Sequence, residues 1–183
     1  MNTKSIVLLI TGIFLFTFCK KDTFTNEIDL ILLAYSPNEP ICTASKQVSG
    51  LGSITWTANS FAQVGNNKFE IAFITYQDTI NWELRETLGF SYIPISVGKF
   101  TLGNESPSAK SSYFRSIGDG DLIDASWDLD TNKNNYLEIT SLDTINRIVT
   151  GRFDTHFIIT TQGIFDKHSE KINFKEGSFS VGY

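Results

Sequence analysis

The stretch Val149-Thr-Gly-Arg-Phe-Asp-Thr-His-Phe-Ile-Ile159 decides the fold, because one parity of it is mostly apolar and the other mostly polar. The apolar parity carries Val149, Phe153, Phe157 and Ile159, and the polar parity carries Arg152, Asp154 and His156. Successive side chains of a β-strand point to opposite faces of the sheet. The pattern therefore predicts a half-buried strand whose first set faces the core.

The C-terminal segment repeats this pattern and then changes parity. Ile172 and Phe174 are apolar, whereas Phe179 and Val181 are the apolar pair after Glu176-Gly177. A glycine at a change of parity predicts a β-bulge. We expect residues 147–159 and 171–181 to pair as an antiparallel hairpin, with Phe153, Phe157, Ile172 and Phe174 buried.

Further period-two segments lie upstream, and turn residues separate them. Ile54, Trp56 and Ala58 share one parity, as do Phe69, Ile71 and Phe73, and as do Trp82, Leu84, Leu88, Phe90 and Tyr92. Glu86 interrupts the last series, which predicts a bulge or a break there. Other strands are expected near residues 98–102, 113–117, 122–129 and 136–140. Roughly nine to eleven short strands predict an all-β fold, either an antiparallel β-sandwich or a small β-barrel.

Composition excludes several classes of function. The 183 residues include 15 Lys and Arg against 20 Asp and Glu, so the net charge is −5. Nucleic-acid binding needs clustered Lys and Arg, so we expect no nucleic-acid partner. With Cys19 and Cys42 as the only cysteines, a disulfide scaffold is excluded, and two thiols do not complete a zinc site. Cys42 is interpreted as a small apolar residue or an idle thiol.

The N-terminus predicts a targeting segment. Residues 6–18 are almost wholly apolar and end at Cys19, which Lys20 and Lys21 follow. A bilayer span needs about 18 residues or more, so this run has the length of a signal-peptide core. We expect residues 1–18 to be a signal peptide, residues 19–49 a tether and residues 50–183 the all-β domain.

The segment "FTFCKKD" (residues 16–22) resembles a bacterial lipoprotein signal, and its "CKKD" start is similar to lipoproteins of the Bacteroidota. Phe18 departs from the Gly, Ala or Ser that usually precedes the cysteine. The resemblance implies lipid attachment, with palmitate among the acyl chains, at Cys19 and an outer-membrane location that faces either the periplasm or the cell exterior.

A second resemblance covers about residues 50–183. The runs "LEITSLDTINRIVTGRF" (residues 137–153) and "FKEGSFSV" (residues 174–181) resemble an uncharacterised family of Bacteroidota lipoprotein β-domains. The shared motifs consist of turn and core residues. The resemblance therefore implies the fold and assigns no catalytic residue.

Few residues suggest a catalytic or metal-binding site. Asp154 with His156, and Asp166 with His168, have the spacing of a metal-chelating or base-and-orienter pair on a strand. The polar parity of the first pair and the turn position of His168 favour ordinary surface roles. Glu83 and Glu86 can suggest a glycosidase pair, but such a pair needs a cleft.

The segment from Asp128 to Ile139 begins like a calcium loop, with Asp128, Asp130, Asn132 and Asn134 at alternate positions. Lys133 replaces the expected Gly, and Ile139 replaces the expected Glu. Asp119 and Asp121 lie nearby in the sequence. A polar hairpin loop explains the same residues, and we expect no metal there.

These observations favour a non-enzymatic binding or interaction module at the outer membrane, whose ligand or protein partner the sequence does not identify. The alternative is a small-molecule carrier with an apolar or glycan-binding cavity inside a β-barrel. We expect no cofactor and no catalytic residue, and the only assigned site is the lipid attachment at Cys19.

Overall fold

The structure is a computed structural model. It describes residues 42–76, 84–104, 108–117, 122–163 and 168–183. Cys19 and the proposed signal peptide lie outside these residues, as do Trp82, Glu83, Asp119, Asp121 and Asp166. No helix in the described part of the chain is long and apolar enough to cross a membrane.

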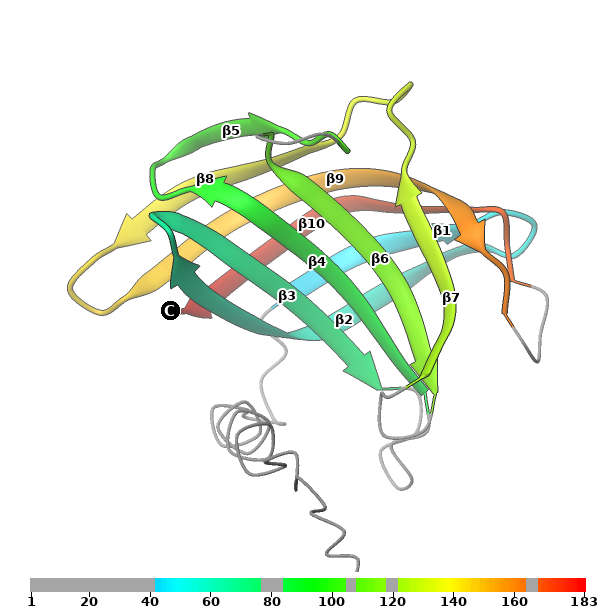
Figure 1. The fold of residues 1–183 in the computed structure, drawn as a ribbon. Helices are drawn as coiled ribbons and strands as arrows, with labels where there is room; N and C mark the ends of the chain where they lie inside the picture. Colours follow the sequence, from blue (N-terminus) through cyan, green and yellow to red (C-terminus); the bar gives the residue numbers. More distant parts are fainter. Residues whose placement is uncertain (1–41, 77–83, 105–107, 118–121, 164–167) are drawn as a thin grey trace, which may run out of the picture. The chain divides into compact units, whose positions relative to one another are not determined.

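The described residues form a closed antiparallel β-barrel, which confirms the all-β prediction and selects the barrel over the sandwich (Figure 1). Eight strands close the wall in the order β10-β1-β2-β3-β4-β6-β7-β9, and β9 pairs again with β10. Two extra strands, β8 and β5, continue from β9. The ten strands are β1 (Cys42–Val48), β2 (Gly52–Gly65), β3 (Lys68–Tyr76), β4 (Leu84–Pro94), β5 (Gly98–Thr101), β6 (Lys110–Ile117), β7 (Leu122–Leu129), β8 (Tyr136–Asp143), β9 (Ile148–Thr161) and β10 (Lys171–Gly182).

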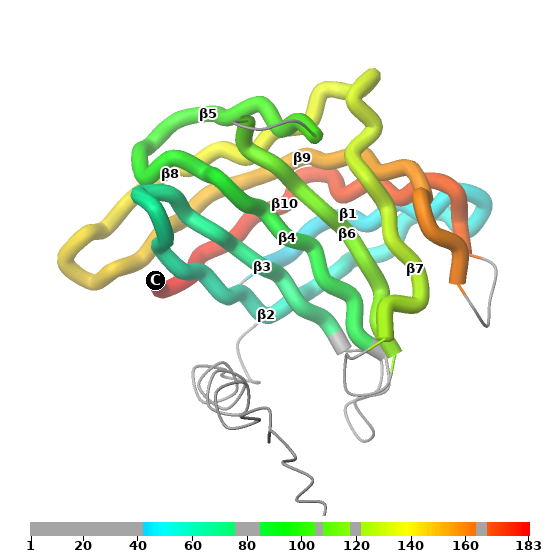
Figure 2. Tube along the Cα trace, viewed as in Figure 1, coloured from blue at the N-terminus to red at the C-terminus, as the bar shows by residue number. Residues whose placement is uncertain are grey.

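Strand β9 holds the barrel and its extension together, because two strands share one of its edges. Its first half pairs with β8, from Ile148 to Asp154, and its last part pairs with β7, from Phe157 to Thr161. The other edge pairs with β10. Figure 2 shows β5 leaving the wall between β4 and β6 to join β8.

The predicted hairpin is confirmed. Strands β9 and β10 are antiparallel, with Ile172 opposite Phe157. Phe153, Phe157, Ile172 and Phe174 are all buried, and Ile159 packs against the same core. The alternation of apolar and polar residues predicted these buried side chains correctly because one face of each strand is removed from water.

The barrel begins before residue 50, where the sequence analysis had placed the domain boundary. Strand β1 pairs with both β2 and β10, so it is part of the wall. Cys42 and Ala44 are buried and Thr43 is exposed. The segment has the period of a strand, but its small residues made that period inconspicuous.

The bulge or break predicted at Glu86 is wrong. Strand β4 runs through Glu86 without irregularity, and the carboxylate is buried. The irregularity lies further along, where Tyr92 has a φ of 61° and the pairing with β3 shifts. Tyr92 is consequently exposed, contrary to its predicted parity, and Ile93 takes the buried position.

The bulge predicted at Glu176-Gly177 is present, and the structure explains both residues. Glu176 has a φ of 52°, and the register with β9 shifts between Phe174 and Gly177. A Cβ atom on Gly177 would overlap the ring of Phe153. The glycine is required by this close approach, since its neighbour Glu176 carries the left-handed backbone.

We predict that Gly177→Ala lowers the free energy of unfolding by about 1–3 kcal/mol, because the methyl group must displace a fully buried aromatic ring. Gly65→Ala is the matched control, since a Cβ atom there meets no atom within 4 Å. Urea unfolding of both variants measures the difference. Equal stability of the two variants would contradict the packing described here.

Candidate functional site

Aromatic side chains fill the middle of the barrel. The Phe73 ring lies 5.4 Å from the rings of both Phe153 and Phe179, and Phe90 lies 5.2 Å from Phe153. An eight-stranded barrel is just wide enough for its own side chains to fill. Space for a ligand therefore has to lie toward an end of the barrel.

A buried ion pair crosses the interior next to this aromatic core. Lys46 of β1 donates hydrogen bonds to both oxygens of Glu86 of β4, at 2.7 Å each, and to the Tyr113 hydroxyl at 2.9 Å. The Trp56 indole donates to Glu86 Oε2 at 3.2 Å. The three ammonium protons thus have three acceptors, which is the condition for burying a charge.

Local electrostatics reflect this burial. Burial lowers the pKa of Lys46 below its ordinary value, although the Glu86 carboxylate opposes that change. Burial and the neighbouring Glu86 raise the pKa of Tyr113 well above its usual range. Glu86 therefore offsets part of the desolvation that disfavours the Lys46 cation, and the same surroundings favour the neutral phenol of Tyr113.

A second polar cluster lies beside the pair. His168 Nε2 and Asp124 Oδ2 are 2.7 Å apart, and both side chains are under one-tenth exposed. Arg115 Nη1 lies 3.4 Å from His168 Nδ1. A guanidinium only donates, so His168 accepts at Nδ1 and donates from Nε2 to Asp124. The Trp127 ring packs on the imidazole at 5.8 Å.

The two clusters meet at a cavity of about 340 Å³ at one end of the barrel, which we call the mouth cavity. Its polar residues are Lys46, Glu86, Tyr113, Arg115, His168 and Ser169, and its apolar residues are Val48, Leu51, Ile54, Trp127 and Ile172. Leu51 and Ile54 are 82% and 57% exposed, so they form the rim. The mouth cavity thus has a charged floor and an apolar rim.

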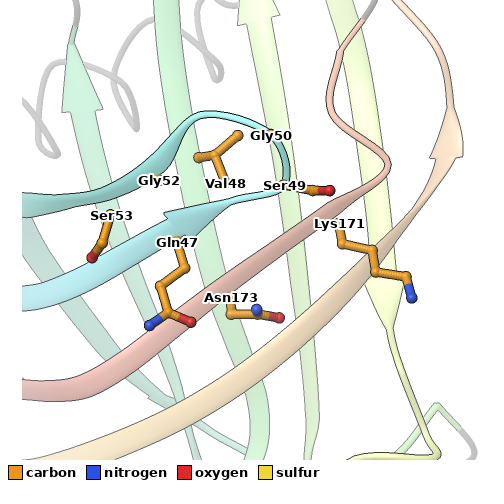
Figure 3. Close-up of a pocket in the computed structure, with 8 residues that line it drawn as sticks. All are labelled: Gln47, Val48, Ser49, Gly50, Gly52, Ser53, Lys171 and Asn173. Atoms are coloured by element: carbon orange, nitrogen blue, oxygen red, sulfur yellow. The ribbon is translucent and has the colours of Figure 1, made fainter.

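A larger depression of about 520 Å³ lies on the outside of the barrel (Figure 3). Gln47 and Asn173 face each other there on adjacent strands, and Val48, Lys171 and small residues of the β1–β2 turn and the start of β2 complete the lining. Lys171 is its only ionisable lining residue. We favour the mouth cavity as the functional site because it combines an enclosed floor with converging polar groups.

In the structure, each histidine of the aspartate–histidine pairs suggested by the sequence contacts another polar side chain. His156 Nε2 is 3.7 Å from Asp154, but Lys175 Nζ lies between them, at 2.6 Å from His156 and 3.0 Å from Asp154. Burial and Lys175 lower the pKa of His156, which Asp154 partly offsets. A cation thus occupies the position that a metal would need. His168 pairs with Asp124, which is 44 residues away.

The calcium-like loop stabilises the point where β7 and β8 diverge along the shared edge of β9. Asn135 Oδ1 accepts from the His156 amide at 2.7 Å, at the point where neither strand pairs with β9. Asp130 Oδ1 accepts from the Asn132 amide, and Asn135 Nδ2 donates to the Asp130 carbonyl at 2.8 Å. These contacts are those of a polar turn. Among the described residues, no group of three or more His, Cys, Asp or Glu can hold a metal ion.

Glu86 is held by Lys46, and its suggested partner Glu83 lies outside the described residues. Cys42 is a free, fully buried thiol whose pKa is raised by burial, in agreement with a small apolar role.

The mouth cavity was not predicted from the sequence, although one signal was available. Lys46 and Glu86 both occupy the apolar parity of their strands. A charged residue at such a position is buried, and a buried charge needs a partner. One lysine and one glutamate in these positions could have suggested the pair. No comparable signal connects Asp124 with His168.

Comparison with known proteins gives no match to any family model, curated sequence or solved structure. The resemblance to Bacteroidota lipoprotein β-domains therefore stays a prediction.

Proposed function

We propose that this protein is a lipid-anchored, non-enzymatic β-barrel that binds a small molecule in its mouth cavity. The observation that carries the proposal is a cavity of about 340 Å³ whose floor is built from buried, paired charges. Small-molecule sites occupy about 300–1,000 Å³ and combine apolar walls with a few placed polar groups. Eight-stranded barrels can hold one small ligand.

Binding fits the polar groups better than catalysis does. Lys46 already donates to three acceptors. His168 has an aspartate at Nε2, as a catalytic base often does, but Nδ1 faces the Arg115 guanidinium. A base of that kind needs a nucleophile or substrate proton at its second nitrogen. The arrangement holds Arg115 in place and leaves neither ring nitrogen of His168 to accept a substrate proton.

The interaction-module hypothesis has less support than the carrier. A protein-binding surface would need an exposed apolar patch of several hundred Å². Tyr92, at 44%, is the only aromatic residue among the large exposed apolar side chains of the described regions. We therefore propose the carrier, which was the alternative, as the function.

The anchor part of the proposal rests on the sequence. If Cys19 carries the lipid, residues 1–18 are removed and two or more acyl chains hold the protein at the outer membrane. Lys20 and Lys21 then lie near anionic headgroups, where each adds about 1 kcal/mol of attraction. The acyl chains thereby hold the barrel close to a membrane.

We predict that Val48→Trp abolishes small-molecule binding, because an indole placed at position 48 fills the mouth cavity that Val48 lines. Val64→Trp is the matched control, since Val64 is exposed near the opposite end of β2. Saturation-transfer NMR with a chemically diverse fragment set measures binding to the Cys19→Ala chain and to both variants in that background. Fragments that bind the parent chain and Val48→Trp equally well would refute the mouth cavity as the site.

We predict that Cys19→Ala removes the protein from the membrane. Wild-type and mutant chains are expressed in a host of the Bacteroidota with a clickable fatty acid, and membranes are then separated. The wild type should be labelled and membrane-bound, whereas the mutant should lose both properties. Unlabelled, soluble wild-type protein would contradict the lipid anchor. That result would not bear on the proposed binding in the mouth cavity.

A further inference from the structure

The charges that line the mouth cavity are unbalanced. Lys46 and Arg115 are cations, and Glu86 is the single carboxylate among the lining residues. Asp124 is close by, but its Oδ2 accepts from His168 and the residue does not line the cavity. Two cations against one anion make the cavity a site for negative charge.

Arg115 is the cation with unused donors. Lys46 has all three protons in hydrogen bonds. The Arg115 Nε atom is buried and has no hydrogen-bond partner among the described residues, and its Nη1 makes only the long contact to His168. The Nε atom is enclosed by protein atoms, so a ligand acceptor would have to use the Nη groups, of which Nη1 is held only by its long contact to His168.

Neighbouring residues hold Arg115 in position. Arg115 lies directly opposite Glu86 on the paired strands β6 and β4, and both line the cavity. His168 contacts the guanidinium from the other side, and Asp124 fixes the tautomer of His168. A planar guanidinium held in this way matches a carboxylate through two parallel hydrogen bonds.

The rest of the cavity is apolar. Val48, Leu51 and Ile54 come from β1, the β1–β2 turn and β2, and Ile172 and Trp127 come from β10 and β7. The exposed rim suits an apolar group that enters from solvent, since covering Leu51 and Ile54 removes apolar surface from water. The volume is at the small end for a ligand site.

We infer that the mouth cavity binds a small amphipathic monocarboxylate, with the carboxylate on Arg115 and the apolar part against Val48, Leu51 and Ile54. This inference rests on the proposed function and adds the chemical class of the ligand. Lys46 and Glu86 form the floor and neutralise each other, so the charge of Arg115 remains available to the ligand.

Three probes of equal chain length test the inference: hexanoate, hexan-1-ol and hexylamine. Calorimetric titration at neutral pH, in the Cys19→Ala background, should give hexanoate at least about tenfold tighter binding than hexan-1-ol and no binding of hexylamine. Arg115→Gln should weaken hexanoate binding by about tenfold and hexan-1-ol binding much less, because the Gln amide still donates to a hydroxyl; the retained hexan-1-ol binding shows that the variant is folded. Arg115→Lys should retain part of the preference, because it keeps the charge and loses the planar fork.

Arg152→Gln is the matched control, since Arg152 is an exposed arginine bound to Glu138 on the outer surface. It should leave all three affinities unchanged. Equal binding of hexanoate and hexan-1-ol, or an unchanged hexanoate affinity in Arg115→Gln, would overturn the carboxylate assignment while the mouth cavity still binds small molecules. Failure of all three probes would also overturn it, whereas the proposed function fails separately if no fragment is sensitive to Val48→Trp.

Discussion

The Lys46–Glu86 ion pair is the constraint on which the arrangement of the barrel interior depends. Two charges inside a barrel lose their hydration, and their attraction compensates only when geometry and further hydrogen bonds are favourable. Here Tyr113 and Trp56 complete the set, so four residues from β1, β2, β4 and β6 converge on one point. The pair thereby fixes the positions of four wall strands relative to one another.

The same ion pair separates two regions of the barrel interior, an aromatic core and the mouth cavity. On one side the rings of Phe73, Phe90, Phe153 and Phe179 pack against each other in an aromatic core. On the other side, charged groups line the mouth cavity. Apolar side chains that filled this cavity would leave the polar groups without hydrogen-bond partners. A binding site at one end of the barrel is therefore a consequence of where the charges lie. Arg115, the remaining cation with unused donors, gives that site its chemical preference.

Much of the wall was predictable from the sequence, and little of the site was. The periodicity of residues 149–159 and 171–181 predicted the final hairpin, since one-face burial leaves a local signature. Strand β1 was missed because Cys42, Ala44 and Ser45 are small, and Glu86 was misinterpreted as a break because its partner lies 40 residues earlier. Closure into a barrel and the contact between Asp124 and His168 depend on long-range pairing. Period-two patterns specify faces, and they do not specify which strands become neighbours.

The most direct test of the central claim is a double-mutant cycle on the pair, measured as free energies of unfolding in urea. Lys46→Met and Glu86→Leu should each destabilise the barrel by about 3–5 kcal/mol, because each leaves one buried charge without its partner. The double variant should be more stable than either single variant, since no charge remains and the volumes are similar, although Trp56 and Tyr113 each lose a hydrogen-bond partner. Single substitutions that each cost less than about 1 kcal/mol, as for a surface pair, or costs that simply add in the double variant, would contradict the account.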